Sequence, residues 1–312
     1  MKLDIMKTSI SPKACQWQIF LVFILPFFMA CRSISAHKIS RLPQQLQESS
    51  GLIADSGNRF WSLNDSGNDP AIYQFDEKGV LLKTIKVNNA TNVDWEEMQL
   101  DNKGNLYIAD FGNNYHTRRD LVIYKITDFK NKTQDSVIKA ERIEFDYEQQ
   151  FDFPPADVDR HFDAEAMIVL NDTIVIFTKD FTSKPYSGKT WIYKIPNKIG
   201  HHTAKLVSIF NTHKTGKYKG AITGAALSPN QDKIVLMSYQ KLWIFNVIQP
   251  IEQIFTKNIN SVFTFGLSQF AQREAIAFKD GCTLYVSSER LKNMLGGNLS
   301  KIDLCRYLKL SD

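Results

Sequence analysis

Short apolar runs alternate with polar turns through almost the whole chain after residue 37. Runs of five to eight residues rich in Ile, Val, Leu, Tyr and Phe are separated by turn sequences such as DSGN, DNKGN, LNDT, SPNQD and KDG. Apolar runs of this length and composition, bounded by such turns, predict β-strands. No segment after residue 37 has the apolar spacing of a convincing amphipathic helix. We therefore expect an antiparallel all-β fold.

A five-residue motif recurs along the chain. Its first position is usually acidic or polar, its fourth is small and its fifth is apolar. The copies are ESSGL at 48, DWEEM at 94, DAEAM at 163, TGAAL at 223 and QREAI at 272. Each copy begins a unit of strand, turn, strand, loop and third strand, and the third strand has an aromatic centre in IYQF, IYKI and LWIF. Four-stranded units that repeat in this way are typical of β-propeller blades.

The two ends of the chain complement each other. A fourth strand is expected in VLLKTIKV, IKAERIEFDY, TAKLVSIFNT and EQIFTKNI, but the fifth unit runs out of chain after KIDLC, and HKISRLPQQL before the first motif is unassigned. We predict a propeller of five four-stranded blades, closed by this N-terminal segment as the missing outer strand, which removes an exposed edge. A sixth blade between 128 and 163 and a β-sandwich are the alternatives, although a sandwich does not explain the motif.

Carboxylates gather at one face of the predicted propeller. The innermost strand of a blade begins on the face where the second strand ends, so motif starts and second-strand ends converge there. Clustered oxygen ligands favour calcium or magnesium, and we expect calcium before magnesium. The predicted cation ligands are Asp94, Glu96, Asp163, Glu165 and Glu274. The predicted ligand-binding residues are Asn64, Asp65, Asp110 and Asn113.

Other roles for these carboxylates stay open at this stage. Propellers also use such positions for hydrogen bonds between blades, and basic side chains nearby in the sequence can neutralise the charge. The candidates for that pairing are Arg118, Arg119, Arg160, Lys179 and Arg273. His161 stands beside the acidic motif in DRHFDAE and is the candidate general base, with a loop position at the blade entrance as the simpler interpretation.

Several short sequence motifs between residues 48 and 119 resemble those of a known protein group. In order along the chain they are SGL, NDSG, DWE, ADFGNN and R. The chain resembles exported bacterial β-propeller proteins and, more distantly, the gluconolactonase and senescence-marker-protein superfamily. In that superfamily central Glu, Asn and Asp side chains hold a divalent cation that polarises a lactone or ester carbonyl. The resemblance implies a similar central site here, with Asn113 where the pattern leads us to expect Asp, so that one ligand is neutral.

Three functions are compatible with this pattern. The first is recognition of a ligand, either a small molecule or an envelope protein, at a cation-binding face. The second is metal-dependent hydrolysis of a lactone or phosphoester, with Asn64 and Asn113 orienting the substrate and His161 carrying the proton. The third is a structural role in the envelope that needs no metal. The net charge of +5 falls to +3 without residues 1–30, which argues against a nucleic-acid partner, and we expect a monomer.

The N-terminus carries an export signal. The apolar run at 19–30, IFLVFILPFFMA, follows several lysines and has 12 residues. A membrane-spanning helix needs about 20, so the run predicts a signal-peptide core. FMAC resembles a bacterial lipobox, which would make Cys31 the lipidated first residue and anchor the protein in the cell envelope. A cut after Ala36 would instead release a secreted or periplasmic protein. Residues 1–36 are thus the expected leader, and 37–312 a single propeller domain.

Cysteine usage agrees with export. With either cut, Cys282 and Cys305 are the thiols left free in the mature chain. Two cysteines in an oxidising compartment predict one disulfide, and antiparallel pairing of their strands about the NMLGGN loop would place them opposite each other. Two buried unpaired thiols are the alternative.

Overall fold

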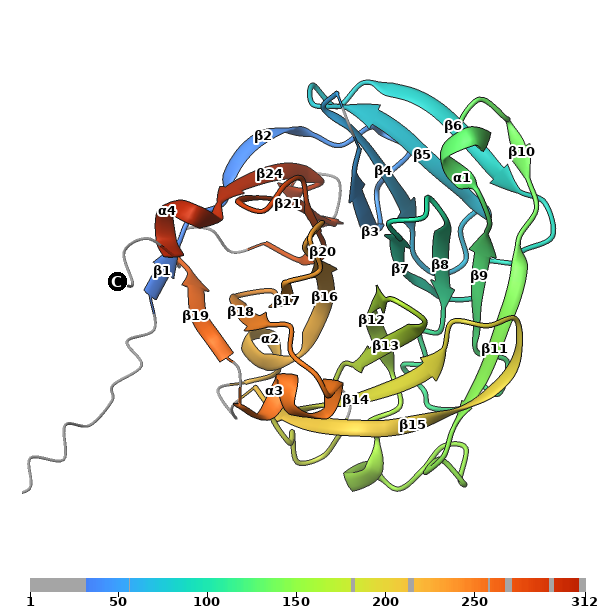
Figure 1. Ribbon diagram of the computed structural model, residues 1–312, viewed down its shortest axis with the longest axis vertical. Helices are drawn as coiled ribbons and strands as arrows, with labels where there is room; N and C mark the ends of the chain where they lie inside the picture. The colour runs from blue at the N-terminus through green and yellow to red at the C-terminus, as the bar shows by residue number, and fades with distance from the viewer. Residues whose placement is uncertain are drawn as a thin grey trace, which may run out of the picture. The chain divides into compact units, whose positions relative to one another are not determined.

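The apolar runs form strands that pair into five four-stranded blades in the computed structural model (Figure 1). From the innermost strand outward, blade 1 consists of β3 (Ser49–Ala54), β4 (Arg59–Asn64), β5 (Ala71–Asp76) and β6 (Leu81–Val87). Blade 2 consists of β7 (Trp95–Leu100), β8 (Leu106–Asp110), β9 (Val122–Ile126) and β11 (Glu141–Tyr147). Blade 3 consists of β12 (Ala164–Leu170), β13 (Thr173–Thr178), β14 (Lys189–Pro196) and β15 (Gly200–Asn211).

The last two blades follow the same order, and blade 5 takes its outer strand from the N-terminal segment. Blade 4 consists of β16 (Ile222–Leu227), β17 (Lys233–Ser238), β18 (Lys241–Asn246) and β19 (Ile259–Phe265). Blade 5 consists of β20 (Arg273–Phe278), β21 (Thr283–Ser288), β24 (Asn298–Asp303) and β2 (His37–Arg41). The structure describes residues 32–55, 57–180, 183–212, 216–257, 259–266, 271–291 and 295–308.

Short elements lie outside the blades. Two strands extend blades by parallel pairing, β1 (Arg32–Ile34) on β19 and β10 (Val137–Ile138) on β6. The outer strands β11 and β15 also pair in parallel, which joins blades 2 and 3 in one sheet. β22 (Arg290–Leu291) and β23 (Leu295–Gly296) form a small hairpin. The helices are α1 (Phe129–Lys132), α2 (Lys217–Gly220), α3 (Ile254–Lys257) and α4 (Leu304–Leu308), with 3₁₀ turns at Asp157–Asp159 and Ile251–Gln253. Among the described residues, none of the helices has the length and apolar character needed to cross a membrane.

The five innermost strands form a closed ring. Each of β3, β7, β12 and β16 lies beside the innermost strand of the next blade, and β20 lies beside β3 (Figure 1). The chain is therefore a five-bladed β-propeller. A sixth blade between 128 and 163 is not formed, because that segment, which is described throughout, supplies only α1, β10, β11 and a 3₁₀ turn.

Apolar side chains fill the space between neighbouring blades. Trp61 and Trp95 pack between blades 1 and 2, and Trp243 packs between blades 3 and 4. Each of these rings is at most 1% exposed. Full burial of a large apolar side chain contributes about 1.5–3 kcal/mol, so the blades are held together chiefly by these interfaces. The aromatic centres of the third strands, Tyr73, Tyr124, Tyr193 and Trp243, are all buried, as the repeat predicts.

The ends of the chain meet in blade 5. β2 pairs antiparallel with β24, so the predicted closure by the N-terminal segment is confirmed. The predicted disulfide is also present, between Cys282 and Cys305, whose Cα atoms are 5.0 Å apart. Cys282 immediately precedes β21, and Cys305 lies in α4 rather than in a strand, because β24 ends at Asp303. Cys31 and the apolar run at 19–30 lie outside the described residues.

Two details of the predicted repeat are wrong, both in blade 4. EQIFTKNI was expected to be the fourth strand, but it contains the 3₁₀ turn and α3, and the strand begins at Ile259. Ile251, Ile254 and Phe255 are buried at a spacing of three and four residues, which is the period of a helix. The motif also begins at Ala221 rather than Thr223, because Thr223 is the residue skipped between Ile222 and Gly224 in the pairing of β16 with β17.

Candidate functional site

A cavity of about 200 Å³ lies at the face where the inner strands begin. We call it the acidic cavity, because the described residues that line it include seven carboxylates and a single basic side chain, Lys179. The carboxylates are Glu48, Asp65, Asp94, Glu96, Glu165, Glu274 and Glu289. Ser50, Ser66, Asn114, Tyr239 and Gln272 complete the lining. Five of the nine residues predicted to bind a cation or ligand are thus brought together, namely Asp65, Asp94, Glu96, Glu165 and Glu274.

A β-bulge in each inner strand explains why glutamates reach this cavity. In blade 2, Trp95 pairs with Asp110 and Glu97 pairs with Ala109, so Glu96 is an extra residue without a partner in the ladder. The extra residues of the five blades are Gly51, Glu96, Glu165, Thr223 and Glu274. A bulge bends the strand and changes the direction of the side chain. In three blades it therefore turns a glutamate toward one shared space.

Lys179 is the counter-charge built into the acidic cavity. It follows β13, and its Nζ lies 2.8 Å from Glu165 Oε1. Both side chains are at least nine-tenths buried. Burial alone lowers the pKa of Lys179, but the carboxylates of Glu165 and Glu274 outweigh that effect and raise the pKa well above its ordinary value. Lys179 is therefore charged at neutral pH and offsets one of the seven carboxylates.

Several of the other carboxyls hold their protons more tightly than usual. Burial, followed by repulsion from Glu165, raises the pKa of Asp94 to about 6. Burial, followed by repulsion from Glu48, raises the pKa of Asp65 to about 7. Burial raises the pKa of Glu274 to about 8, even though Lys179 acts in the opposite direction. Burial and the charge of Glu165 raise the pKa of Glu96 well above its ordinary value. The cavity is therefore short of positive charge near neutral pH.

Gly112 leaves a space beside two of these carboxylates. A Cβ atom at this position would lie 2.5 Å from Asp94 Oδ2 and 2.5 Å from Glu96 Oε1. The two oxygens therefore face one small volume that any side chain other than glycine would fill. Among the described residues, no basic side chain forms an ion pair with Asp94 or Glu96. In this part of the acidic cavity, two carboxylate oxygens therefore have no basic side chain in direct contact.

Asp163 and Asn113 lie buried next to the cavity rather than in its lining. Asp163 Oδ1 accepts a hydrogen bond of 2.7 Å from the Asn113 backbone N–H. Asp163 Oδ2 and Asn113 Nδ2 are buried and have no hydrogen-bond partner in the described structure. Burial, followed by the charge of Glu165, raises the pKa of Asp163 well above its ordinary value. An unpaired buried acceptor is costly and marks a place where a cation or water would be stabilising.

Asn64 and Asp110 connect parts of the backbone. The Asn64 side chain accepts from the Glu48 N–H at 3.3 Å and donates to the Gln45 carbonyl at 2.7 Å. Asp110 accepts from the Asp94 N–H at 3.0 Å and forms an ion pair of 2.9 Å with Arg118. These contacts lie within blade 1 and within blade 2, so they are not the hydrogen bonds between blades that the sequence left open.

His161 lies on an aromatic surface outside the lining of the acidic cavity. Its ring stacks on Trp191, with centroids 4.1 Å apart and planes inclined by 12°. Burial lowers the pKa of His161 to about 4, so the ring is neutral at physiological pH. The stacking gives His161 a packing role at the entrance to blade 3.

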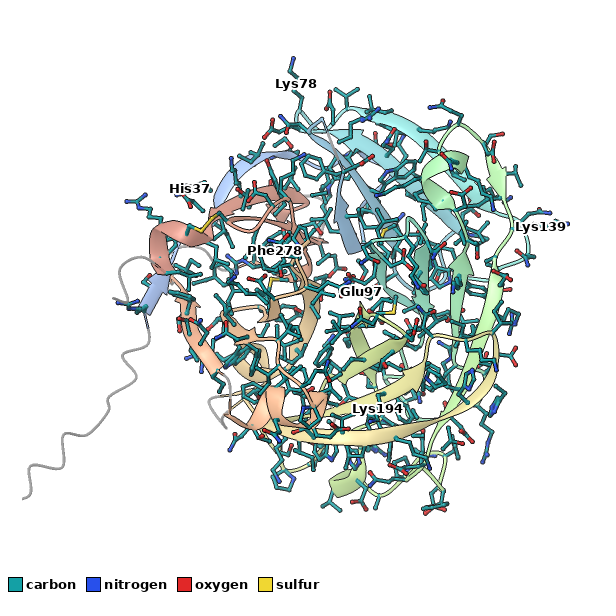
Figure 2. All side chains as sticks on the ribbon, viewed as in Figure 1. His37, Lys78, Glu97, Lys139, Lys194 and Phe278 are labelled. Atoms are coloured by element: carbon teal, nitrogen blue, oxygen red, sulfur yellow. A yellow bond between two sulfur atoms is a disulfide. The ribbon has the colours of Figure 1, made fainter. Side chains whose placement is uncertain are left out.

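Glu97 is a buried carboxylate that the sequence reasoning did not select. It is fully buried, and Figure 2 shows it at the centre of the ring, whereas Lys78 and Lys139 lie at the outer edge. Its two carboxylate oxygens accept from the Met98 N–H at 2.9 Å and, across the ring, from the Ala225 N–H of blade 4 at 3.4 Å. Gln99 donates to the Ala225 carbonyl at 3.1 Å. These contacts join blade 2 to blade 4 across the centre of the ring.

The repeated motif itself marks Glu97 as unusual. With the corrected alignment, the fourth motif position is Gly or Ala in the other four blades, as Gly51, Ala166, Gly224 and Ala275. Gly51 shows why small residues are required, because a Cβ there would lie 2.6 Å from the Met98 backbone nitrogen. Glu289 was also predictable, since it lies 17 residues after its motif start, as Asp65 does.

A second, larger cavity of about 1110 Å³ opens beside the acidic cavity, and we call it the vestibule. The two cavities share Ser66, Asp94 and Asn114. The rest of the vestibule is lined by Val93, Tyr115, Thr117, Arg118, Pro154, Arg160, Ser183, Lys184 and Tyr186. The acidic cavity is thus approached through a space whose walls carry basic and aromatic side chains.

The carboxylates do not already form a closed metal site. Within the described ranges, no group of three or more His, Cys, Asp or Glu side chains is arranged so that it could hold a metal ion. Cation binding therefore requires rotation of the carboxylates around the space beside Gly112. The donor set fits a hard cation, since it consists of oxygens from Asp94 and Glu96 with the unpaired Asp163 nearby.

Comparisons with known proteins give structural likenesses at low sequence identity. No protein-family model and no curated protein sequence matches this chain. Among solved structures, the PQQ-bound aldose sugar dehydrogenase from Streptomyces coelicolor is 10% identical, with a TM-score of 0.47 over 86% of this chain and 98% of that one. The WD40 repeats of RRP9 are 10% identical, with a TM-score of 0.41 over 82% and 67% of the two chains. A protein from Lactobacillus plantarum is 14% identical, with a TM-score of 0.37 over 77% and 63%. What these proteins share with the chain is the fold alone.

Proposed function

We propose that the acidic cavity binds a divalent cation, calcium in preference to magnesium, and that the cation-bearing face recognises a ligand. The observation that carries this proposal is the space beside Gly112, where Asp94 and Glu96 each direct an oxygen without a basic partner in the described structure. Carboxylates in a site of low dielectric favour a bound cation, because it replaces the protons that otherwise offset their charge.

Calcium suits this donor set better than magnesium. Calcium accepts six to eight oxygens in flexible geometry, whereas magnesium demands a near-ideal octahedron. The acidic cavity offers carboxylates from several blades, together with Ser50 and Asn114, and these ligands were not found in a closed arrangement. A site assembled by rotating side chains matches the more tolerant ion.

A role in ligand binding is better supported than a role in hydrolysis. A hydrolase needs a proton carrier at the reacting group, and His161, the candidate from the sequence, is packed on Trp191. The Tyr239 hydroxyl lies in the acidic cavity but donates to Glu274 Oε1 at 2.9 Å, and burial raises its pKa. Neither His161 nor Tyr239 therefore supports a catalytic site over a recognition site.

The test uses two matched glycine substitutions. Calorimetric titration of the purified protein with calcium should show one strong site, which Gly112→Ala should weaken at least about tenfold, about 1.4 kcal/mol, because the added Cβ occupies the space between the carboxylates. Gly281→Ala is the control, because a Cβ there meets no atom within 4 Å. No calcium binding by the unsubstituted protein, or equal weakening in both variants, would overturn the proposal.

A further inference from the structure

The vestibule has the opposite charge from the acidic cavity that it adjoins. Arg118, Arg160 and Lys184 line the vestibule, against the single carboxylate of Asp94. Arg118 is held by Asp110 at 2.9 Å and Asp120 at 3.0 Å, so its charge is largely offset. Arg160 pairs with Asp157 at 3.0 Å, but its Nε is buried without an acceptor in the described structure. Lys184 forms no ion pair with a described carboxylate.

Flat apolar surfaces stand beside these basic groups. Tyr115, Pro154 and Tyr186 line the same space, and Tyr115 is 84% exposed. Aromatic side chains that remain exposed in a concave site provide contact area for a ring. The volume of about 1110 Å³ is far larger than a simple inorganic anion needs. The walls therefore suit a molecule that has both an anionic group and a flat ring.

Asp94 lines both cavities and would bring a ligand in the vestibule close to a cation in the acidic cavity. Ser66, Asp94 and Asn114 belong to both cavities, so a cation held beside Gly112 would be within reach of a group in the vestibule. An anionic oxygen there would face the cation on one side and the Arg160 and Lys184 side chains on the other. Charge-assisted hydrogen bonds of this kind are about twice as strong as neutral ones.

We propose that the vestibule binds a small anionic oxyacid carried on a flat ring, with its anionic group between the cation and the side chains of Arg160 and Lys184. This inference rests on the proposed cation site and adds the chemical class of the ligand. It concerns binding and requires no reaction.

Phenyl phosphate is a suitable probe, because it combines a ring with an anionic oxyacid. In calorimetric titrations of the purified protein with calcium present, phenyl phosphate should bind at least about tenfold more tightly than phenol and than inorganic phosphate. Arg160→Gln and Lys184→Gln should each weaken phenyl phosphate about tenfold and leave calcium affinity unchanged. Lys130→Gln, at a basic residue lining a separate cavity, is the matched control and should change neither.

The outcomes separate this inference from the proposed function. Calcium binding without any preference for phenyl phosphate over phenol, or with no effect of either vestibule variant, would overturn the inference and leave the cation site standing. Binding of phenyl phosphate with the same variant effects but without calcium binding would overturn the proposed function and the cation contact, and would leave the contacts with Arg160 and Lys184 standing. Tighter binding of inorganic phosphate than of phenyl phosphate would contradict the role of the ring.

A second inference concerns the N-terminus and rests on β1. Arg32, Ser33 and Ile34 pair with Phe263, Thr264 and Phe265 of β19. Ile34 is fully buried in the core between blades 4 and 5. The Ser35 N–H donates to the Tyr307 hydroxyl at 3.1 Å. A cut after Ala36 would remove this whole strand and uncover the edge of β19.

We infer that the leader is cut before Cys31, by hydrolysis of the peptide bond between Ala30 and Cys31, so that the mature chain keeps β1. Of the two cuts that the sequence predicts, this is the one that preserves the buried Ile34. Arg32 follows the new terminus directly and is already in the sheet. An anchor at Cys31 would therefore hold blade 4 close to the membrane surface.

Intact mass and N-terminal analysis of the full chain exported from a bacterial host test this inference. The mature protein should begin at residue 31, and Cys31→Ser should abolish that cut. Pro43→Ala, beyond both cut sites, should be processed normally. A mature terminus at His37, or an uncut leader in the unsubstituted chain, would overturn the inference. A chain that begins at His37 should also melt at a lower temperature than one that begins at Arg32, because it lacks the buried Ile34.

Discussion

Blades 2 and 3 have the same backbone at the acidic cavity and meet the charge there in opposite ways. In blade 2 the Gly112 N–H donates to the Asp94 carbonyl at 3.1 Å, and in blade 3 the Lys179 N–H donates to the Asp163 carbonyl at 2.7 Å. Gly112 and Lys179 thus donate to the corresponding carbonyl of the two blades, next to the bulge glutamates Glu96 and Glu165. Blade 3 supplies its own cation from the side chain. Blade 2 has the space beside Gly112 in the corresponding region.

A repeated backbone can carry both a permanent and an exchangeable charge. Lys179 offsets Glu165 in every folded molecule, because the ion pair is buried and closed at 2.8 Å. At Gly112 no side chain is present, so among the described residues the charge of Asp94 and Glu96 is offset only at longer range, by Lys179 and, for Asp94, Arg118. A difference of one side chain therefore separates a structural ion pair from a proposed binding site.

The largest effect should come from removing the permanent cation. Lys179→Met leaves Glu165 buried without its partner, and breaking a buried ion pair costs about 3–5 kcal/mol. The free energy of unfolding at pH 7 without calcium, measured by chemical denaturation, should fall by that amount, and calcium should restore part of it. A loss below about 1 kcal/mol would show that the Lys179 side chain does not stabilise the fold as a permanent counter-charge to Glu165.

A matched pair of glutamate variants should sharpen the contrast. Glu165→Gln removes the charge that Lys179 contacts, so it should reduce the free energy of unfolding by about 1–3 kcal/mol without calcium. Glu96→Gln replaces a buried carboxyl that forms no ion pair with a described basic side chain, and it should leave the stability of the calcium-free protein unchanged or raised. The same Glu96→Gln change should weaken calcium binding. Equal destabilisation by both variants in chemical denaturation would contradict the assignment.

The pH dependence should distinguish protons from calcium as the counter-charge. The pKa values of Asp94, Asp65 and Glu274 are raised to about 6, 7 and 8 in the folded protein. At these three carboxyls the folded state therefore binds more protons than the unfolded state, so their contribution to the stability of calcium-free protein should be full below about pH 4 and be lost as pH rises to about 8. Saturating calcium should flatten this decline, measured by denaturation across that range.

The smallest expected effect is the release of protons. Calcium that binds at pH 6 should displace about half a proton from Asp94, because this carboxyl is about half protonated there. Titrations in two buffers with different heats of ionisation measure the number. No difference between the buffers would mean that calcium binds elsewhere.

The repeat allowed most of the fold to be predicted, because each blade follows the same order of turns and apolar runs. Glu96, Glu165 and Glu274 were found for the same reason, since the bulge falls at the same motif position in their three blades. In blade 4 the apolar residues of EQIFTKNI predict a strand, whereas the segment forms a 3₁₀ turn and α3. That error did not disturb the blade count, since a strand follows directly at Ile259.

The equivalence of Gly112 and Lys179 could not be predicted from spacing. Gly112 lies 18 residues after Asp94, and Lys179 lies 16 residues after Asp163. The turn between the first two strands differs in length, and only the hydrogen bonds of the folded chain show that the two residues match. The bridge from Glu97 to Ala225 was unpredictable for a related reason, because the two residues are 128 apart and meet only across the closed ring.

Closure of the ring by β2 sets the order of events in folding. Residues His37 and Lys301 are partners in the ladder, so the last interface is formed between segments at opposite ends of the chain. Contacts of such long sequence separation are slow to form, since the entropy of a very large loop must be lost first. Blades 1 to 4 can assemble while the chain emerges, but blade 5 must wait for its final strand. A chain crossing a membrane from its N-terminus would thus carry an unpaired β2 until almost the last residue had passed.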